Sequence, residues 1–298
     1  MGSISQAITE MGLDLYNELN KNTANKNIFV SPMSISTGLV MVLLGARGNT
    51  ATQMQTVSVN KTLVHASLFL PCLKPSPSRC DLVGGIHTEF QTLLSQLKNL
   101  NKSYVLSLAN SLFAQKGYNF HQSKSVQMMY QKDRFKIAHI QEMNAQILMI
   151  PYAGKSLSMI ILLPDDITGL EQKLIRWTSL ESMKDREVEV YLPRFKLEDT
   201  FELNLPLQEM GMIDVFEESK ADLSGMAPPR KLFLSKVVHK AYVEVNEEGT
   251  LAAAATGSVV VNRSHISDGL FMADHPFLFF IQHNPTNTIL FLGKLCSP

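Results

Sequence analysis

Two histidines and two cysteines stand at nearly even spacing in the first third of the chain. They are His65, Cys72, Cys80 and His87, separated by six, seven and six residues. Imidazole and thiolate are the usual ligands of structural zinc, but such sites draw their ligands in pairs about two to five residues apart. The observed spacing matches no common zinc finger or ribbon. We therefore interpret the four residues as surface cysteines and solvated histidines, and predict no metal or other cofactor.

The motifs of catalysis are also incomplete. The tripeptide 154–156, Gly-Lys-Ser, ends like a phosphate-binding loop, but that motif requires a glycine where Met149 stands. The chain has no G-x-S-x-G, H-E-x-x-H or G-x-G-x-x-G sequence. The acidic pair Glu247-Glu248 ends a predicted strand with no other site feature nearby, so it is a poor candidate for general acid and base. The sequence does not indicate an enzyme.

One stretch combines residue types that rarely occur together. It runs from Glu244 to Gly269 and reads EVNEEGTLAAAATGSVVVNRSHISDG. Alanines 252–255 favour helix, whereas valines 259–261 favour strand. The stretch is too apolar for a solvated linker, yet its side chains are too small to anchor a core. Such a composition suits a segment that moves from its initial position in the folded protein to a different final position.

Length and composition bound the fold that holds these residues. The chain has 298 residues, 45% of them hydrophobic and 18% charged, which suits one large domain. Its net charge of zero argues against nucleic acid or an acidic membrane as a partner. The first residues lack a signal-peptide pattern, and three cysteines do not make a disulfide framework. We expect a cytoplasmic protein, with release from the cell without a signal peptide as a second route.

Hydrophobic spacing predicts mainly helices in the first part of the chain. Ser31 should cap a helix that begins at Pro32, and Asn49 or Thr50 should cap the next one. Helices are expected over residues 4–20, 32–46, 48–57, 86–100, 168–184 and 205–212. Residues 57–85 contain several prolines and no sustained period, so they are a predicted surface loop.

Strands dominate the second part. They are expected from Ile28, over 103–115, 125–131, 134–143, 145–153 and 157–166, as a pair within 186–203, and over 231–247, 275–284 and 288–298. Phe277, Phe279 and Phe280 are predicted core residues, and His275 and His283 strand ends rather than ligands. Helices first and strands last predict a single α+β domain without repeats or linkers.

Four segments resemble the serpin family. They are NIFVSPMSISTGLVMVLLGARGNTATQM (27–54), NAQILMIPYAGKSLSMIILLP (144–164), VYLPRFKLE (190–198) and ADHPFLFFIQHNPTNTILFLGKLCSP (273–298). The last is typical of the intracellular, ovalbumin-type clade B, which includes leukocyte elastase inhibitor. The resemblance implies an α+β serpin fold over residues 1–298, with a helical N-terminal part, three β-sheets and an exposed reactive-centre loop.

The resemblance assigns the unusual stretch to the reactive-centre loop, residues 248–270. In the family, a serine protease cleaves this loop, and the freed segment inserts as a strand into the largest sheet with the protease attached. Trypsin-like proteases bind a basic side chain in their primary pocket. The implied function is suicide inhibition of such a protease, with Arg263–Ser264 as the reactive bond. The implied hinge is Glu248, Gly249, Thr250, Leu251, Ala252, Ala253, Ala254, Ala255 and Thr256.

The side chains of the loop fit insertion as a strand. Alternate residues of a strand point to opposite faces. Leu251 replaces a glutamate common in the family, but it lies on the face that would point outward. The inserted face would carry only small side chains, which can slide beneath a sheet without clashes: Thr250, Ala252, Ala254, Thr256, Ser258 and Val260.

The chain departs from the family in length. It is shorter by about a fifth, more than ordinary loop variation gives, and the missing block is placed at about residues 122–124. That block includes the third strand of the largest sheet, whose fifth strand resembles 231–247. Without it, 231–247 either pairs with 103–115 or shows an open edge, so a protein expected to be monomeric risks loop–sheet polymers. The irregular loop 57–85 is a second departure.

These departures leave an alternative function open. The chain would then be a non-inhibitory or inactive serpin remnant, such as a splice form. A remnant would be cleaved by the protease as a substrate, or would act only by binding.

Overall fold

The computed structural model describes residues 3–21, 23, 26–59, 90–96, 127–141, 144–164, 183–226, 232–246 and 269–298. No helix in these ranges is long and apolar enough to cross a lipid bilayer. The helices are α1 (Ser3–Lys21), α2 (Pro32–Leu43), α3 (Gly48–Val59), α7 (Asn204–Glu209) and the short 3-10 helix η4 (Asp214–Phe216), and residues 90–96 are also helical.

The first two helices form for reasons visible in the sequence. Apolar residues at helical spacing give α1 a buried face, and the helix predicted over 4–20 is confirmed. α2 begins at Pro32, and the Oγ of Ser31 accepts a hydrogen bond from the Ser34 N–H (3.2 Å), so the predicted cap is confirmed too. α2 ends at Leu43, earlier than predicted.

The prediction of a cap at Asn49 or Thr50 is wrong. α3 begins at Gly48, where φ is +54°, a conformation that favours glycine. The two polar side chains bind a later part of the chain instead. Asn49 donates to Asp214 (2.5 Å), and the Thr50 hydroxyl accepts from the Asp222 N–H (3.0 Å). Local sequence rules predicted that one of these side chains caps the helix, but both form tertiary hydrogen bonds instead.

The strands in the described ranges form two sheets. One has eight strands in the order β1-β10-β9-β4-β3-β2-β5-β8, and the other consists of β6 and β7. Their bounds are β1 (Ile28–Val30), β2 (Met128–Ile140), β3 (Ala145–Pro151), β4 (Leu157–Pro164), β5 (Lys184–Pro193), β6 (Phe195–Glu202), β7 (Val238–Val245), β8 (Leu270–Met272), β9 (Phe277–His283) and β10 (Thr288–Leu295).

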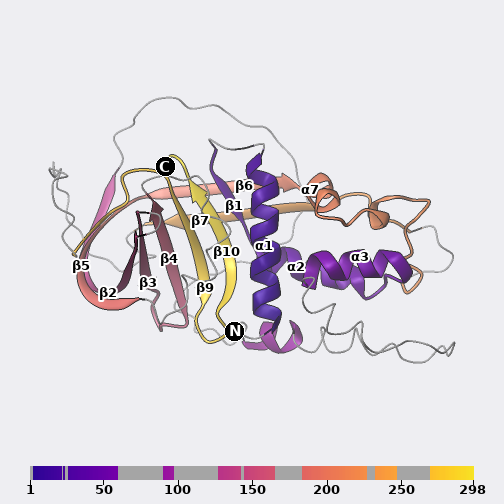
Figure 1. Cartoon of the computed structure of the whole chain (residues 1–298), viewed down its shortest axis with the longest axis horizontal. Coiled ribbons are helices and arrows are strands. Elements are labelled where there is room, and N and C mark those ends of the chain that lie inside the picture. The colour runs from indigo at the N-terminus through magenta and orange to yellow at the C-terminus, as the bar shows by residue number, and fades with distance from the viewer. Residues whose placement is uncertain are drawn as a thin grey trace.

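The predicted α+β class is confirmed, and the arrangement of the sheets adds detail. All neighbouring strands are antiparallel except β5 and β8, which are parallel. In Figure 1 the β6–β7 pair runs crosswise to β1, β9 and β10. β7 lies within 231–247, so the two-stranded sheet contains the strand that resembles part of the family's largest sheet. The predicted strand 103–115 lies outside the described residues.

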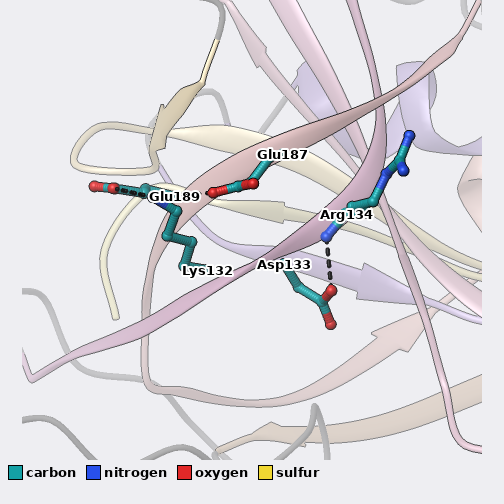
Figure 2. Close-up of polar contacts among 5 residues, drawn as sticks. All are labelled: Lys132, Asp133, Arg134, Glu187 and Glu189. Atoms are coloured by element: carbon teal, nitrogen blue, oxygen red, sulfur yellow. Dashed lines mark hydrogen bonds and ion pairs between the residues drawn. The ribbon is translucent and has the colours of Figure 1, made fainter.

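The prediction of two strands over 125–131 and 134–143 is wrong, because β2 is one strand of 13 residues. The charged sequence Lys132-Asp133-Arg134 suggested a turn. It lies opposite Glu189, Val188 and Glu187 of β5 without interruption. Lys132 forms ion pairs with Glu187 (3.0 Å) and Glu189 (3.3 Å), as Figure 2 shows. Because the neighbouring strand places charges of opposite sign beside the charged sequence, that sequence continues as a strand without a turn.

The centre of the large sheet is buried on both faces. Every residue of β4, β9 and β10 is buried, as expected for strands that read as continuous apolar runs. Phe277 and Phe279 pack with Phe29 and Phe195 on the side of β6 and β7, whereas Phe280 packs on the opposite side. The three predicted core phenylalanines are therefore confirmed. The small sheet packs on the side of Phe277 and Phe279, and residues of α1 and α2 contribute to the core on both sides.

Candidate functional site

The strand that leads into the predicted reactive-centre loop is β7, and β6 pairs with it along its whole length. The outer face of this pair is polar. Lys240 Nζ lies 2.5 Å from Glu198 Oε1, and this hydrogen bond and charge lower the pKa of Glu198. The Tyr242 hydroxyl donates to Glu244 (2.6 Å), and Lys196 Nζ lies 5.2 Å from the Tyr242 ring centroid. Exposed pairs of this kind add little stability.

The inner face of the pair is apolar apart from Asp199 and His239. His239 is buried, and its Nε2 accepts a hydrogen bond from the Ser31 N–H (2.9 Å). The Ser31 hydroxyl in turn donates to the Leu290 carbonyl (2.7 Å). Burial lowers the pKa of His239 to about 4, so the imidazole is neutral at pH 7 and accepts at Nε2. This chain of bonds ties β7 to the start of α2 and to β10.

Asp199 holds a second N–H group of the same edge. One carboxylate oxygen accepts from the Phe29 N–H, two residues before Ser31. The other oxygen, Oδ2, is buried without a hydrogen-bond partner. Burial raises the pKa of Asp199 to about 6, and the bond from Phe29 only partly opposes that rise. Phe29, Ser31, Asp199 and His239 form a polar joint between β1 and the two-stranded sheet, hereafter the joint.

The chain returns from the predicted loop at β8, on the edge of the large sheet. Leu270 lies opposite Glu189 of β5 in a parallel register. The Gly269 carbonyl accepts from the Glu189 N–H (2.6 Å), and the Ala273 N–H donates to Tyr191 (2.9 Å). A Cβ on Gly269 would lie 3.3 Å from the Glu187 carbonyl oxygen, so the backbone passes close to β5 at this point. The two flanks of the loop thus belong to different sheets.

The predicted site residues themselves lie outside the described residues. This holds for the hinge (248–256), for Arg263 and Ser264, and for the four histidines and cysteines between 65 and 87. Within the described ranges, no group of three or more histidine, cysteine, aspartate or glutamate side chains could hold a metal ion. His283 ends β9, as predicted, and its Nδ1 bonds the Thr286 hydroxyl (2.7 Å). The structure therefore describes the loop's two supports.

Comparisons with known proteins decide the family. The model of the Serpin (serine protease inhibitor) family matches residues 6–123 and 121–298. The chain belongs to the serpin family. This serpin is 37% identical to leukocyte elastase inhibitor of Sus scrofa and to Serpin B11 of Homo sapiens, in both cases over 399 residues with all of both chains covered. Among solved structures it is similar to uncleaved ovalbumin, with 29% identity, full coverage of both chains and a TM-score of 0.75.

A second ovalbumin structure, a cleaved and loop-inserted mutant, is also similar to this serpin, with 30% identity, full coverage of both chains and a TM-score of 0.69. The predicted resemblance to the ovalbumin-type clade is confirmed. The alignment with the Sus scrofa protein runs over 399 residues and this serpin has 298, so 101 aligned positions hold none of its residues. The two segments matched to the family overlap at 121–123, and the missing block at about 122–124 stays a prediction.

Sequence reasoning missed the joint. The signal for Asp199 was present, because every second residue of FKLEDTFE faces inward and the third inward residue is acidic. His239 likewise occupies an inward position of β7. The partners could not be predicted, since Phe29 of β1 and Ser31, which follows that strand, lie more than 160 residues away in the chain.

Proposed function

We propose that this serpin inhibits trypsin-like serine proteases as a suicide substrate, with Arg263–Ser264 as its reactive bond and residues 248–256 as its hinge. The observation that carries the proposal is the placement of the flanks. β7 and β8 belong to different sheets, and residues 247–268 must connect them. Arg263 is the only lysine or arginine between Gly249 and Lys294. A protease that needs a basic side chain has one bond to attack in this connection.

The fixed register of β7 supports insertion. A segment that turns back after Asn246 would run antiparallel to β7, and its small inward side chains would meet no obstruction. β6 and the joint hold β7 while the new strand forms its hydrogen bonds. Each bond contributes about 1 kcal/mol net. Insertion is therefore favourable as soon as cleavage frees the segment.

The second candidate function is that of a protease substrate without a trap. It is favoured by the 101 aligned positions that hold no residue of this serpin, and by β7, which pairs with β6 alone among the described strands. A strand that pairs along one edge forms about half of the ladder bonds of a strand that pairs along both. Insertion with fewer hydrogen bonds is less favourable, so the protease has time to hydrolyse the acyl-enzyme and dissociate.

The expected protease class differs from the one in the relatives' names. Leukocyte elastase inhibitors are named for elastase. A small apolar pocket suits elastase, whereas a carboxylate at the base of the pocket suits Arg263. We expect Arg263→Val to move cleavage from trypsin to elastase. The same bond should then be cut by a different enzyme, which separates specificity from the trap.

Incubation with trypsin at near-equal ratio, followed by denaturing gel electrophoresis and intact mass, tests the proposal. A covalent adduct and a released fragment that begins at Ser264 are expected. Clean cleavage at Arg263 without an adduct would establish the substrate function instead. Arg263→Ala is the control, and it should lower the cleavage rate at this bond at least about 100-fold. Cleavage elsewhere, with Arg263 untouched, would contradict both functions.

We also propose that residues 1–298 form one domain, monomeric and cytoplasmic, with a tendency to form loop–sheet polymers when warmed. The support is a single large sheet whose two ends, β1 and β8, come from opposite ends of the chain. Size-exclusion chromatography before and after mild heating measures the tendency. A serpin that stays monomeric after heating would contradict it.

A further inference from the structure

Asp199 occupies a position where an apolar residue is expected. The inward-facing residues on either side of it in β6 are Leu197 and Phe201, and Ala241 lies opposite it on β7. An ionised carboxylate in such surroundings is costly unless its oxygens are all hydrogen-bonded. Only one of the two oxygens of Asp199 has a partner, the Phe29 N–H. The carboxylate of Asp199 therefore binds the Phe29 N–H of β1, but its unpartnered oxygen destabilises the same contact.

The bound oxygen has a clear structural task. β1 pairs with β10 along one edge, and its opposite edge faces the two-stranded sheet. On that edge the N–H groups of Phe29 and Ser31 are bound by Asp199 and His239 respectively. A buried N–H left without an acceptor would cost free energy, so both side chains are needed where they stand.

We infer that Asp199 is a strained latch: its carboxylate fastens β1 to the two-stranded sheet, but its unpartnered charge destabilises that attachment at neutral pH, and protonation relieves the strain. The inference concerns the uncleaved protein and does not depend on the reactive bond. Asp199 then accounts for part of the strain energy that the folded protein contains at neutral pH. A buried polar atom without a hydrogen-bond partner is a recognised sign of such strain.

The titratable groups around Asp199 define what acid can do. His239 of β7 lies on the same inner face, whereas Glu198, Lys240 and Glu244 lie on the outer face. The residues of β1 carry only apolar side chains. Burial raises the pKa of Asp199 to about 6 and lowers that of His239 to about 4, so both groups are neutral in the folded protein between these values. At pH 7.5 only Asp199 is charged.

Asp199→Asn tests the latch, because asparagine keeps an acceptor oxygen for the Phe29 N–H and removes the charge. The measurement is the melting temperature of the uncleaved protein at pH 7.5 and at pH 5. We expect the variant to melt about 2–5 °C above the parent protein at pH 7.5 and to lose this advantage at pH 5, where Asp199 is protonated. A gain of the same size at both pH values, or a loss at both, would overturn the inference.

Two further variants separate strain from fastening. Asp199→Ala removes the acceptor, so it should melt below Asp199→Asn at both pH values. Equal melting of the two variants would show that Asp199 does not fasten β1. Glu198→Gln is the matched control, since it removes a carboxylate from the next residue, on the outer face. It should change the melting temperature by about 1 °C or less, without a pH-dependent gain. These results require no protease, so they remain informative if no cleavage at Arg263 is found.

Discussion

The two sheets of this serpin are held together in different ways. In the eight-stranded sheet, the central strands β4, β9 and β10 are buried along their whole length, and stacked phenylalanines fill the space beside them. The two-stranded sheet has a polar outer face with exposed ion pairs, and its inner face combines buried apolar side chains with the joint. The loop leaves from the second sheet. In the proposed function, the sheet that would accept the loop is thus the one whose buried face combines apolar packing with the polar joint.

The largest effect that would test this difference is expected at Phe279. Its ring is fully buried, stacks 5.8 Å from Phe29 between centroids, and fills the space over Gly293, where a Cβ would lie 2.4 Å from it. Phe279→Ala should lower the free energy of unfolding by about 3–5 kcal/mol through lost burial and the cavity left behind. Tyr242→Ala, on the outer face of β7, is the comparison and should cost much less. Urea unfolding of both variants measures the contrast, and similar losses would contradict it.

Acid should act on the two-stranded sheet through His239. The pKa of about 4 in the folded protein lies below the unfolded value of 6.5, so the contribution of the neutral imidazole is complete above pH 6.5 and is lost as pH falls toward 4. The loss is about 3 kcal/mol. Asp199 opposes it, because its raised pKa makes the folded protein take up a proton near pH 6. In the parent protein the two changes largely cancel.

The prediction is therefore sharpest in the Asp199→Asn variant. Its free energy of unfolding should fall by about 3 kcal/mol between pH 7 and pH 4, more steeply than that of the parent protein. The double variant Asp199→Asn, His239→Gln keeps an acceptor for the Ser31 N–H and should lose this part of the slope. Denaturant titrations at several pH values measure it. Equal slopes in the single and double variants would show that His239 does not titrate in the joint.

The sequence predicted those parts of the molecule that local pattern determines. The helix over 4–20, the cap at Ser31 and the apolar runs of β9 and β10 each depend on residues close in the chain. The sequence motifs around these elements also identified the family. The agreement between these predicted and observed elements shows that hydrophobic periodicity and helix capping indicate them without knowledge of tertiary contacts.

The sequence failed where distant residues decide. Lys132-Asp133-Arg134 suggested a turn, because a charged run is costly in a lone strand, and β5, about 55 residues later, supplies the opposite charges. Asn49 and Thr50 suggested a cap, but Asp214 and Asp222 engage them. The joint was missed for the same reason. Each of these three errors concerns polar side chains whose partners lie in another element.

The smallest effect is expected on β2, where polar contacts are many and exposed. Lys132 bridges Glu187 and Glu189, but the three side chains are 49%, 65% and 40% exposed, so water and salt screen the attraction. Lys132→Ala should lower the melting temperature by about 1 °C at low salt and not measurably in 0.5 M sodium chloride. Arg134→Ala is the matched control, since the guanidinium of Arg134 points away from both carboxylates in Figure 2. If Lys132→Ala proved as damaging as a change in the joint, burial would not be what separates strong from weak polar contacts in this fold. The register of β2 would then depend on its surface charges, and the long strand would need Lys132 to form at all.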